Sequence, residues 1–272
     1  MQKSLFTLEG KTVLLSGGSG FFGPYFAEAL LEAGASLVVV DRDPIPENSM
    51  FESAKQKGKI IWYQADLYDD TATRRQYAKI AATHAVDVLI NNAFDFSKRT
   101  GFNDPSGRLE NATRDQVMSS FESGVYWAVR ATQMFSAGMK ERGSGSIINV
   151  CSMYALVVPA PDLYEGTDKF NPPGYSAAKA ALLQFTRYSA SFLSPEVRVN
   201  AISPGAIPNL ETETYNAPKI DDPILDRLNK KILLKRMGHP RDLVGAIVFL
   251  ASGAASYITG QNIVIDGGLT IT

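Results

Sequence analysis

Short runs of apolar, often β-branched residues alternate along the chain with longer segments whose apolar residues recur at helical spacing. This alternation is typical of β-α-β units and a parallel sheet, and it constrains the fold more than any other feature. The predicted strands cover residues 12–15, 37–40, 60–63, 86–90, 147–150, 197–202 and 263–265. The predicted helices cover residues 22–33, 71–82, 114–140, 176–192 and 241–250. Because most of these strands are continuous apolar runs, we expect helices on both faces of the sheet.

The alternation continues over residues 1–272 without a linker, an internal repeat or a low-complexity segment. We therefore predict an α/β fold in which one Rossmann-type domain, a doubly wound parallel sheet with flanking helices, occupies the whole chain. Two proline-rich segments, 154–174 and 206–236, follow the carboxyl ends of predicted strands. Ligands bind at that edge of open α/β sheets, so we expect both segments to shape a substrate site. The alternative is that they are tolerated insertions.

Charge and cysteine content exclude several classes of protein. The 27 basic and 28 acidic residues nearly cancel, so the chain lacks the positive charge with which nucleic-acid binders neutralise phosphates. One cysteine excludes an internal disulfide, and with two histidines it leaves too few ligands for a Cys/His metal site, so no metal is expected. No apolar run is long enough for a signal peptide or a membrane span. We expect a cytoplasmic protein without a membrane or nucleic-acid partner.

A glycine-rich loop, SGGSGFFG at residues 16–23, follows the first predicted strand and precedes a helix. Its glycines allow the backbone to approach a pyrophosphate, to which the helix offers free N–H groups. Asp41 ends the next predicted strand, at the spacing of a carboxylate that binds the adenosine ribose of a dinucleotide. An acid there repels a 2′-phosphate and favours NAD over NADP, whereas Arg42 next to it could accommodate that phosphate. Alternatively, Asp41 is a turn residue before Pro44.

Two segments have the pattern Tyr-x-x-x-Lys. Tyr175 and Lys179 lie in YSAAK on one face of a predicted helix, which follows a strand that ends in Ser152. Tyr215 and Lys219 lie in YNAPK, where a proline disfavours a helix and no predicted strand brings a partner. We therefore place the candidate site at the first segment.

The segments NNA at 91–93, RVNAISPG at 198–205 and TGQNIVIDGG at 259–268 complete a series that resembles the short-chain dehydrogenases/reductases over nearly the whole chain. The resemblance implies an NAD(P)-dependent oxidoreductase that interconverts a secondary alcohol and a ketone on a small-molecule substrate. It also implies a homodimer or homotetramer, packed through the helix that holds residues 125–135 and the helix that bears the tyrosine.

The same resemblance implies roles for individual residues. Tyr175 would be the general acid/base, Lys179 would hold the nicotinamide ribose, and Ser152 would hydrogen-bond the substrate oxygen. The cofactor-binding residues expected from the loop, the acidic residue and the resemblance together are Gly17, Ser19, Gly20, Phe22, Gly23, Asp41, Arg42, Asp66, Leu67, Asn92, Ala93, Tyr175, Lys179, Pro204, Gly205 and Ile207.

The chemistry requires a tyrosine with a lowered pKa. Tyrosine ordinarily has a pKa of about 10, and a value near 7 requires about 4 kcal/mol of phenolate stabilisation. A lysine ammonium about 6 Å away supplies about 2.8 kcal/mol at an effective dielectric constant of about 20. We therefore expect Lys179 to lower the pKa of Tyr175, with the positive nicotinamide ring supplying much of the remainder.

The sequence departs from the family pattern in three places. Phe121 stands where the family has an active-site asparagine, and it cannot hold a relay water by the same contacts. Phe94 follows NNA where the family has a glycine. The glycine spacing is that of the larger sugar-nucleotide branch, whose additional substrate domain this chain has no room for.

Segments 164–180 and 203–209 resemble short-chain dehydrogenases of flagellin modification and nonulosonic-acid clusters, which implies a sugar or sugar-phosphate substrate. The polar residues nearby either bind substrate hydroxyls or are solvated loop residues: Asp162, Glu165, Asp168, Lys169 and Asn209. Two other functions stay open. One is a sugar epimerase or dehydratase that retains its NAD, and the other is a catalytically silent cofactor-binding scaffold, suggested by Phe121 and Phe94.

Overall fold

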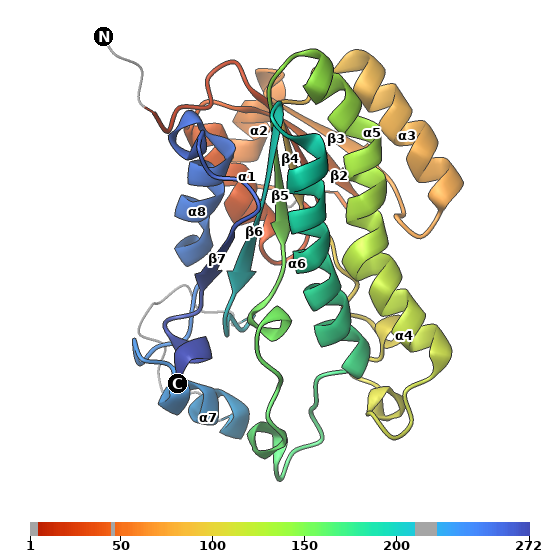
Figure 1. The fold of residues 1–272 in the computed structure, drawn as a ribbon, viewed down its shortest axis with the longest axis vertical. Coiled ribbons are helices and arrows are strands. Elements are labelled where there is room, and N and C mark those ends of the chain that lie inside the picture. The colour runs from red at the N-terminus through yellow and green to blue at the C-terminus, as the bar shows by residue number, and fades with distance from the viewer. Residues whose placement is uncertain (1–4, 45–46, 210–221) are drawn as a thin grey trace.

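A computed structural model describes residues 5–44, 47–209 and 222–272 and contains one parallel sheet of seven strands (Figure 1). The strands are β1 (Thr12–Ser16), β2 (Ser36–Asp41), β3 (Ile60–Gln64), β4 (Val88–Asn91), β5 (Gly145–Val150), β6 (Val197–Pro204) and β7 (Asn262–Ile265). Their order is β3-β2-β1-β4-β5-β6-β7, and every neighbouring pair is parallel. The predicted doubly wound sheet is confirmed. The winding reverses between β1 and β4, and a crevice for a ligand is expected at their carboxyl ends.

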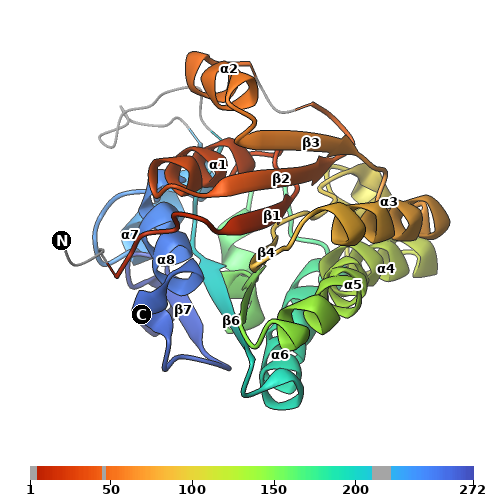
Figure 2. The same ribbon diagram turned by 90° about the horizontal axis from the view of Figure 1, so that it is seen from above.

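Helices cover both faces of the sheet (Figure 2). They are α1 (Gly23–Glu32), α2 (Ser49–Gln56), α3 (Asp70–Thr83), α4 (Arg114–Phe121), α5 (Trp127–Glu141), α6 (Pro173–Leu193), α7 (Pro223–Lys231) and α8 (Arg241–Ala251). Helices α1, α2 and α8 share one apolar core with the sheet, and α3, α5 and α6 share a second core on the opposite face.

Alternation along β1 shows why the strands are continuous apolar runs. Val13 and Leu15 belong to the core beneath α1 and α8, whereas Leu14 belongs to the core beneath α3, α5 and α6. All three side chains are inaccessible to solvent. Because successive residues point to opposite faces, a strand covered on both sides has no polar position.

Three parts of the chain differ from the predicted elements. Helix α2 has only eight residues and too short an apolar pattern to detect, although Asn48 caps it by accepting the Phe51 N–H at 2.8 Å. Helix α7 lies inside the proline-rich segment 206–236, where no helix was predicted. The predicted helix 114–140 is divided into α4 and α5 by a π-helical turn, Glu122–Tyr126.

Glycine allows this π-helical turn to lie close to α6. A Cβ atom on Gly124 would lie 2.8 Å from the Cβ of Ala178 and 3.3 Å from Cε2 of Phe94. Any other residue would push α6 or the Phe94 ring away.

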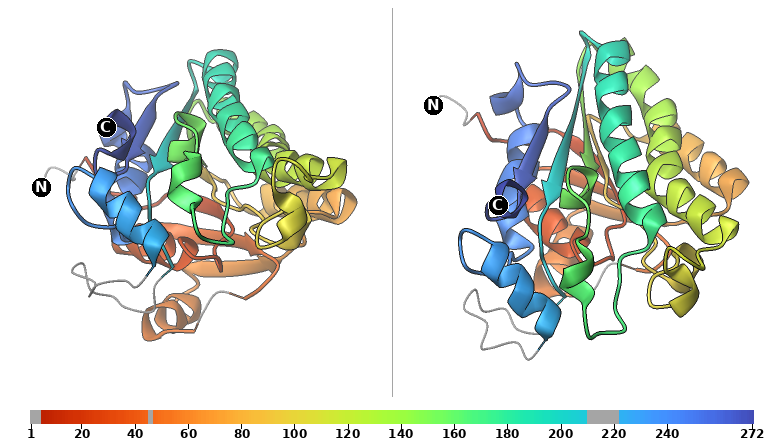
Figure 3. Two further views of the ribbon diagram at one scale, coloured as in Figure 1. Left: turned by 90° about the horizontal axis from the view of Figure 1, so that it is seen from below. Right: turned by 60° about the horizontal axis from the view of Figure 1, so that its bottom comes forward.

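The segment 154–174 packs against α7 near the carboxyl edge of the sheet (Figure 3). A small apolar cluster joins the two, and its buried members are Met153, Leu163, Ala206, Ile224, Leu228 and Ile232. This cluster is separate from the cores on the sheet faces. In the described part of the chain, no helix has the length and apolar character needed to cross a membrane.

Candidate functional site

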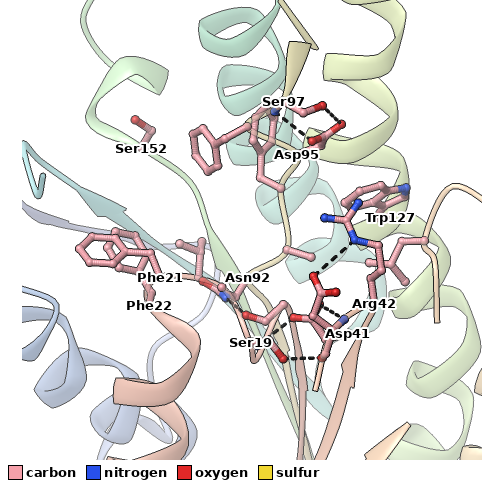
Figure 4. A pocket seen from close by; sticks show the side chains of 18 of the residues that line it. Ser19, Phe21, Phe22, Asp41, Arg42, Asn92, Asp95, Ser97, Trp127 and Ser152 are labelled. Atoms are coloured by element: carbon pink, nitrogen blue, oxygen red, sulfur yellow. Dashed lines mark hydrogen bonds and ion pairs between the residues drawn. The ribbon is translucent and has the colours of Figure 1, made fainter. Parts of the chain in front are cut away.

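A cavity of about 870 Å³ opens at the carboxyl edge of the sheet (Figure 4). Its wall includes these predicted residues: Gly17, Ser19, Gly20, Phe22, Asp41, Arg42, Asp66, Leu67, Asn92, Ala93, Ser152, Tyr175, Lys179, Pro204, Gly205 and Ile207. We call the part around Gly17, Ser19 and Asp41 the glycine-loop end, and the part around Tyr175 and Lys179 the tyrosine end. The volume lies within the usual range for small-molecule sites.

The glycine loop packs too closely for side chains. Gly17 has a φ of +70°, and a Cβ there would lie 2.7 Å from the Cα of Ala93. The Asn92 side-chain amide donates to the Gly17 carbonyl at 2.7 Å and so fixes the loop to the end of β4. Gly23 was predicted to bind the cofactor but is not among the residues of the cavity wall. A Cβ on Gly23 would lie 2.3 Å from the Gly18 carbonyl oxygen, so this glycine lets α1 start against the loop.

The N-terminus of α1 lies next to the glycine loop, where the Gly23 N–H donates to the Gly20 carbonyl at 3.0 Å and Pro24 follows in the first turn. Phe22 occupies the N-cap position and makes no side-chain hydrogen bond there, and the first turn carries no acidic residue. A helix N-terminus without a side-chain cap binds phosphate well, because its N–H groups and its dipole both favour an anion. The loop and α1 therefore fit a dinucleotide pyrophosphate.

Asp41 lies at the end of β2, beside this loop (Figure 4). Its carboxylate accepts the Ser19 N–H at 2.8 Å and the Asp43 N–H at 3.2 Å. The side chain of Arg42 points to Asp43, with 3.5 Å between guanidinium and carboxylate. The carboxylate is therefore both a turn residue and part of the cavity wall, so the two interpretations of Asp41 are compatible.

Two polar residues of the cavity wall, Tyr68 and Asp95, were not predicted from the sequence. The Tyr68 hydroxyl donates to Asp95 at 2.8 Å, and the Arg99 guanidinium lies 3.4 Å from the centre of the Tyr68 ring. Burial raises the pKa of Tyr68, so this hydroxyl stays protonated. The fully buried Arg130 donates to the Leu67 carbonyl at 2.9 Å and anchors the turn that carries Tyr68.

Ser152, Tyr175 and Lys179 meet at the tyrosine end, from the segment after β5 and from α6. All three side chains are buried. The Ser152 hydroxyl hydrogen-bonds Tyr175, and the Lys179 ammonium donates to the Val150 carbonyl at 2.8 Å. Cys151 lies beside them on the cavity wall, and burial raises the pKa of its thiol to about 12.

The pKa of Tyr175 is raised in this structure, whereas the sequence predicted a lowered one. Burial raises the pKa of Tyr175 to about 12, and the Ser152 hydrogen bond opposes this only in part. Burial also lowers the pKa of Lys179 to about 8. Both changes have the same cause, because leaving water disfavours the phenolate and the ammonium alike.

Three phenylalanines after the NNA segment gather around Tyr175. The ring centres of Phe94, Phe96 and Phe102 lie 5.1, 5.8 and 5.4 Å from that of Tyr175. The rings of Phe94 and Phe102 are almost perpendicular to the tyrosine ring. Of these three, the sequence analysis noticed only Phe94, as a departure from the family pattern. Phe121, another of the three departures, is not among the described residues of the cavity wall.

Charged residues of the segment 154–174 contact α7. Lys169 lies 2.6 Å from Asp222 at the start of this helix, and Asp162 lies 3.5 Å from Lys231 at its end. These ion pairs attach the segment to the helix and favour the interpretation as loop residues over hydroxyl recognition.

The other polar residues proposed near the substrate differ in position. Glu165 and Asp168 are exposed, whereas Asn209 is on the cavity wall. Tyr215 and Lys219, the second Tyr-x-x-x-Lys segment, lie outside the described residues. Within the described ranges, no three His, Cys, Asp or Glu side chains come together to hold a metal ion.

Comparison with known proteins links this geometry to oxidoreductases. A family model described as "Enoyl-(Acyl carrier protein) reductase" matches residues 22–270. The chain is 30% identical to the galactitol 2-dehydrogenase (L-tagatose-forming) of Cereibacter sphaeroides, over 99% of this chain and 98% of that protein.

Two solved structures share the fold. A short-chain dehydrogenase from Leptospira borgpetersenii with bound NAD⁺ has a TM-score of 0.82 at 28% identity, covering 99% of this chain and 97% of the other. A gluconate 5-dehydrogenase from Burkholderia cenocepacia, in complex with NADP and tartrate, has a TM-score of 0.81 at 26% identity. This second alignment covers 98% of the present chain and 98% of the gluconate 5-dehydrogenase chain.

Proposed function

We propose, from the premise that this chain belongs to the short-chain dehydrogenase/reductase family, that it oxidises a secondary alcohol of a sugar or sugar alcohol, or reduces the corresponding ketone. The family identifies an NAD(P)-dependent enzyme that acts on hydroxyl groups. The observation that carries the proposal is that Ser152, Tyr175 and Lys179 share one cavity with the glycine loop. In this proposal, residues 1–272 form one cofactor-binding domain.

The residues divide the work between them. The glycine loop and Asp41 would hold the dinucleotide, which in its oxidised form would supply the hydride acceptor and a positive charge to the site. Tyr175 takes the hydroxyl proton, and Ser152 orients the reacting oxygen. Because the pKa of Tyr175 is about 12, its deprotonation depends on positive charge nearby. Lys179, with a pKa of about 8, is protonated at neutral pH and supplies part of that charge.

The glycine-loop end supports NAD in preference to NADP. The Asp41 carboxylate is held at the cavity wall by the Ser19 and Asp43 N–H groups. A 2′-phosphate would bring a second negative charge to this carboxylate. Arg42, the cation able to offset it, is turned toward Asp43.

The tyrosine end supports an uncharged, hydroxyl-rich substrate. Lys179 is the cavity-wall cation beside Tyr175 in the described part of the chain, and its hydrogen bond goes to the protein backbone. The cavity wall also includes the polar side chains of Ser152, Asn103 and Asn209 and the exposed aromatic ring of Phe96. A sugar presents hydroxyls to such amides and C–H groups to such rings. The galactitol dehydrogenase likeness supports the same class of substrate.

The experiment that tests this function is NADH formation from NAD⁺ with a panel of sugars and sugar alcohols, repeated with NADP⁺. Tyr175→Phe should abolish turnover and leave NAD⁺ binding intact, whereas Tyr154→Phe should retain turnover as a matched control 6.5 Å from Tyr175. Substrate isomerisation without net NADH, by protein that retains its NAD, would indicate an epimerase instead. NAD⁺ binding with no turnover on any substrate would indicate a scaffold.

Further parts of the proposal concern assembly and location. Tyr188 and Phe192 on α6 are exposed and stack with ring centres 6.0 Å apart, which supports a subunit contact in a homodimer or homotetramer. A cytoplasmic location suits the chain's one cysteine, which is free. A role in flagellin modification stays a prediction from the sequence.

A further inference from the structure

The Lys179 ammonium is the buried charge of the tyrosine end. Its side chain is 3% exposed, and within the described residues its one hydrogen bond is to the Val150 carbonyl. An ammonium has three N–H donors, and leaving a charge in a dry site without further contacts is costly. The question is therefore what else stabilises this charge.

Phe94 provides a second contact for the ammonium. The Lys179 Nζ lies 5.0 Å from the centre of the Phe94 ring, compared with 5.9 Å from the centre of the Tyr175 ring. A cation within about 6 Å of an aromatic ring is attracted by the negative face of the ring, and the attraction is stronger where water is excluded. The Phe94 ring also stands at 81° to the Tyr175 ring, 5.1 Å away, so it contacts both catalytic side chains.

Neighbouring residues hold the Phe94 ring in this place. Phe96 and Phe102 pack against it, with ring centres at 4.7 and 6.2 Å. On another side lies Gly124, whose missing side chain leaves room for the ring edge. The ring is thus fixed by residues from the loop after β4 and from the π-helical turn between α4 and α5.

We propose that Phe94 is a positioning residue, whose ring keeps the Lys179 ammonium charged and in place beside Tyr175 through a cation–π contact. This inference rests on the proposed function only in that Lys179 and Tyr175 act on the substrate proton. The titratable groups that face Lys179 are Tyr175 on its own helix and Cys151 at the end of β5. Neither is negatively charged at neutral pH, because burial raises the pKa of each to about 12.

The test replaces Phe94 with mono-, di- and trifluorinated phenylalanine. Each fluorine withdraws charge from the ring face and leaves the size of the ring almost unchanged. The readout is the titration of Lys179 in the apo protein, followed by carbon-13 NMR of labelled lysine. We expect the pKa of Lys179 to fall stepwise, by about one pH unit in total. In the active enzyme, the alkaline limb of the kcat profile should shift in the same direction.

The matched control is the same fluorine series at Phe102. Its ring contacts Tyr175 at 5.4 Å and 84°, much as Phe94 does, but it is not among the described rings that Lys179 approaches. Fluorination of Phe102 should leave the pKa of Lys179 unchanged. Equal shifts at both positions, or no shift at Phe94, would overturn the proposal.

Two further variants separate the ring from its volume. Phe94→Tyr keeps an aromatic face and should keep most of the Lys179 pKa, whereas Phe94→Leu should lower it. Because the NMR titration needs neither cofactor nor substrate, it decides on Phe94 even if no substrate is turned over. Loss of the proposed function would show instead as turnover that survives Tyr175→Phe.

Discussion

The glycine-loop end of the cavity is made of backbone turns and carboxylates, whereas the tyrosine end is made of aromatic rings around one buried cation. Gly17 and Asp41 follow directly from the ends of β1 and β2, and Asn92 from the end of β4. Phe94 and Phe102 come from a single irregular loop, and they meet Tyr175 only through the tertiary fold. The first end is therefore determined by local sequence and the second by long-range packing.

The two ends also differ in how far their ionisable side chains are buried. At the glycine-loop end, the Asp41 carboxylate is partly exposed and accepts two backbone N–H groups. At the tyrosine end, burial lowers the pKa of Lys179 and raises that of Tyr175. Substitutions at the first end should therefore alter selectivity, and substitutions at the second should alter chemistry and stability. Four predictions test this difference.

The largest effect is expected at Tyr175. Tyr175→Phe removes the hydroxyl that exchanges the substrate proton, and general acid/base groups contribute about a hundred- to ten-thousandfold to rate. We expect kcat to fall about a thousandfold, with an unchanged Kd for NAD⁺, measured by steady-state kinetics and calorimetry. A variant within tenfold of the wild-type kcat would show that another group moves the proton.

Lys179→Met should stabilise the apo protein at pH 7. The pKa of Lys179 falls from 10.5 to about 8 on burial, which corresponds to about 3 kcal/mol of unfolding free energy lost while the ammonium stays charged. The unfolded chain binds more protons between these pH values, so wild-type stability rises with pH there. The advantage of the variant should thus be full below pH 8 and shrink toward pH 10.5, as measured by urea unfolding.

The control for this measurement is Lys140→Met, since the Lys140 side chain is 42% exposed. It should change the unfolding free energy by less than about 1 kcal/mol at either pH. If Lys179→Met destabilised the protein at pH 7, contacts within the protein would compensate the ammonium for the loss of water more fully than its lowered pKa indicates.

A smaller effect is expected at the glycine-loop end. Asp41→Ala removes the carboxylate that would repel a 2′-phosphate, and we expect the NAD/NADP ratio of kcat/KM to fall about ten- to a hundredfold. Kinetics with both cofactors measures this ratio, and kcat should change little. Asp115→Asn, an exposed change of the same charge on α4, should leave the ratio unaltered. A large loss of kcat in Asp41→Ala would contradict the separation of the two ends.

The smallest effect concerns the ion pair between Lys169 and Asp222, which attaches the segment 154–174 to α7. The lysine side chain is 67% exposed, so Lys169→Ala should lower the unfolding free energy by less than about 1 kcal/mol. The effect should decrease with added salt. Thermal unfolding at low and high ionic strength measures it. An effect that is insensitive to salt would mean that the lysine acts through packing.

The sequence predicted the sheet well, because strands buried on both faces leave a clear apolar signal. Helix α2 and helix α7 were missed, since eight or nine residues give too few turns for a period. Many of the proposed cofactor residues could be located near the carboxyl edge of the sheet in advance, because they lie at or just after a strand end. Gly23 shows the limit of this reasoning, since it is not among the residues of the cavity wall and it lets α1 pack closely against the loop.

The tyrosine end was harder to predict. Tyr175, Lys179 and Ser152 were identified by their pattern, but the direction of the Tyr175 pKa depends on burial, which sequence spacing does not reveal. Likewise, nothing periodic in residues 94–102 indicates that their rings surround the tyrosine. The one local signal was Phe94, a large residue where a small one was expected.

The single cysteine provides a probe of local unfolding at the cavity. Cys151 lies between the strand end and Ser152, is 3% exposed, and keeps its proton because burial raises the pKa of the thiol to about 12. An alkylating reagent reacts with an exposed thiolate, so modification requires β5 to open at this end. The rate of labelling, one adduct per chain, therefore reports how often the floor of the cavity opens. A bound dinucleotide should slow the labelling. The ratio of the two rates would give the free energy by which the dinucleotide stabilises the closed cavity.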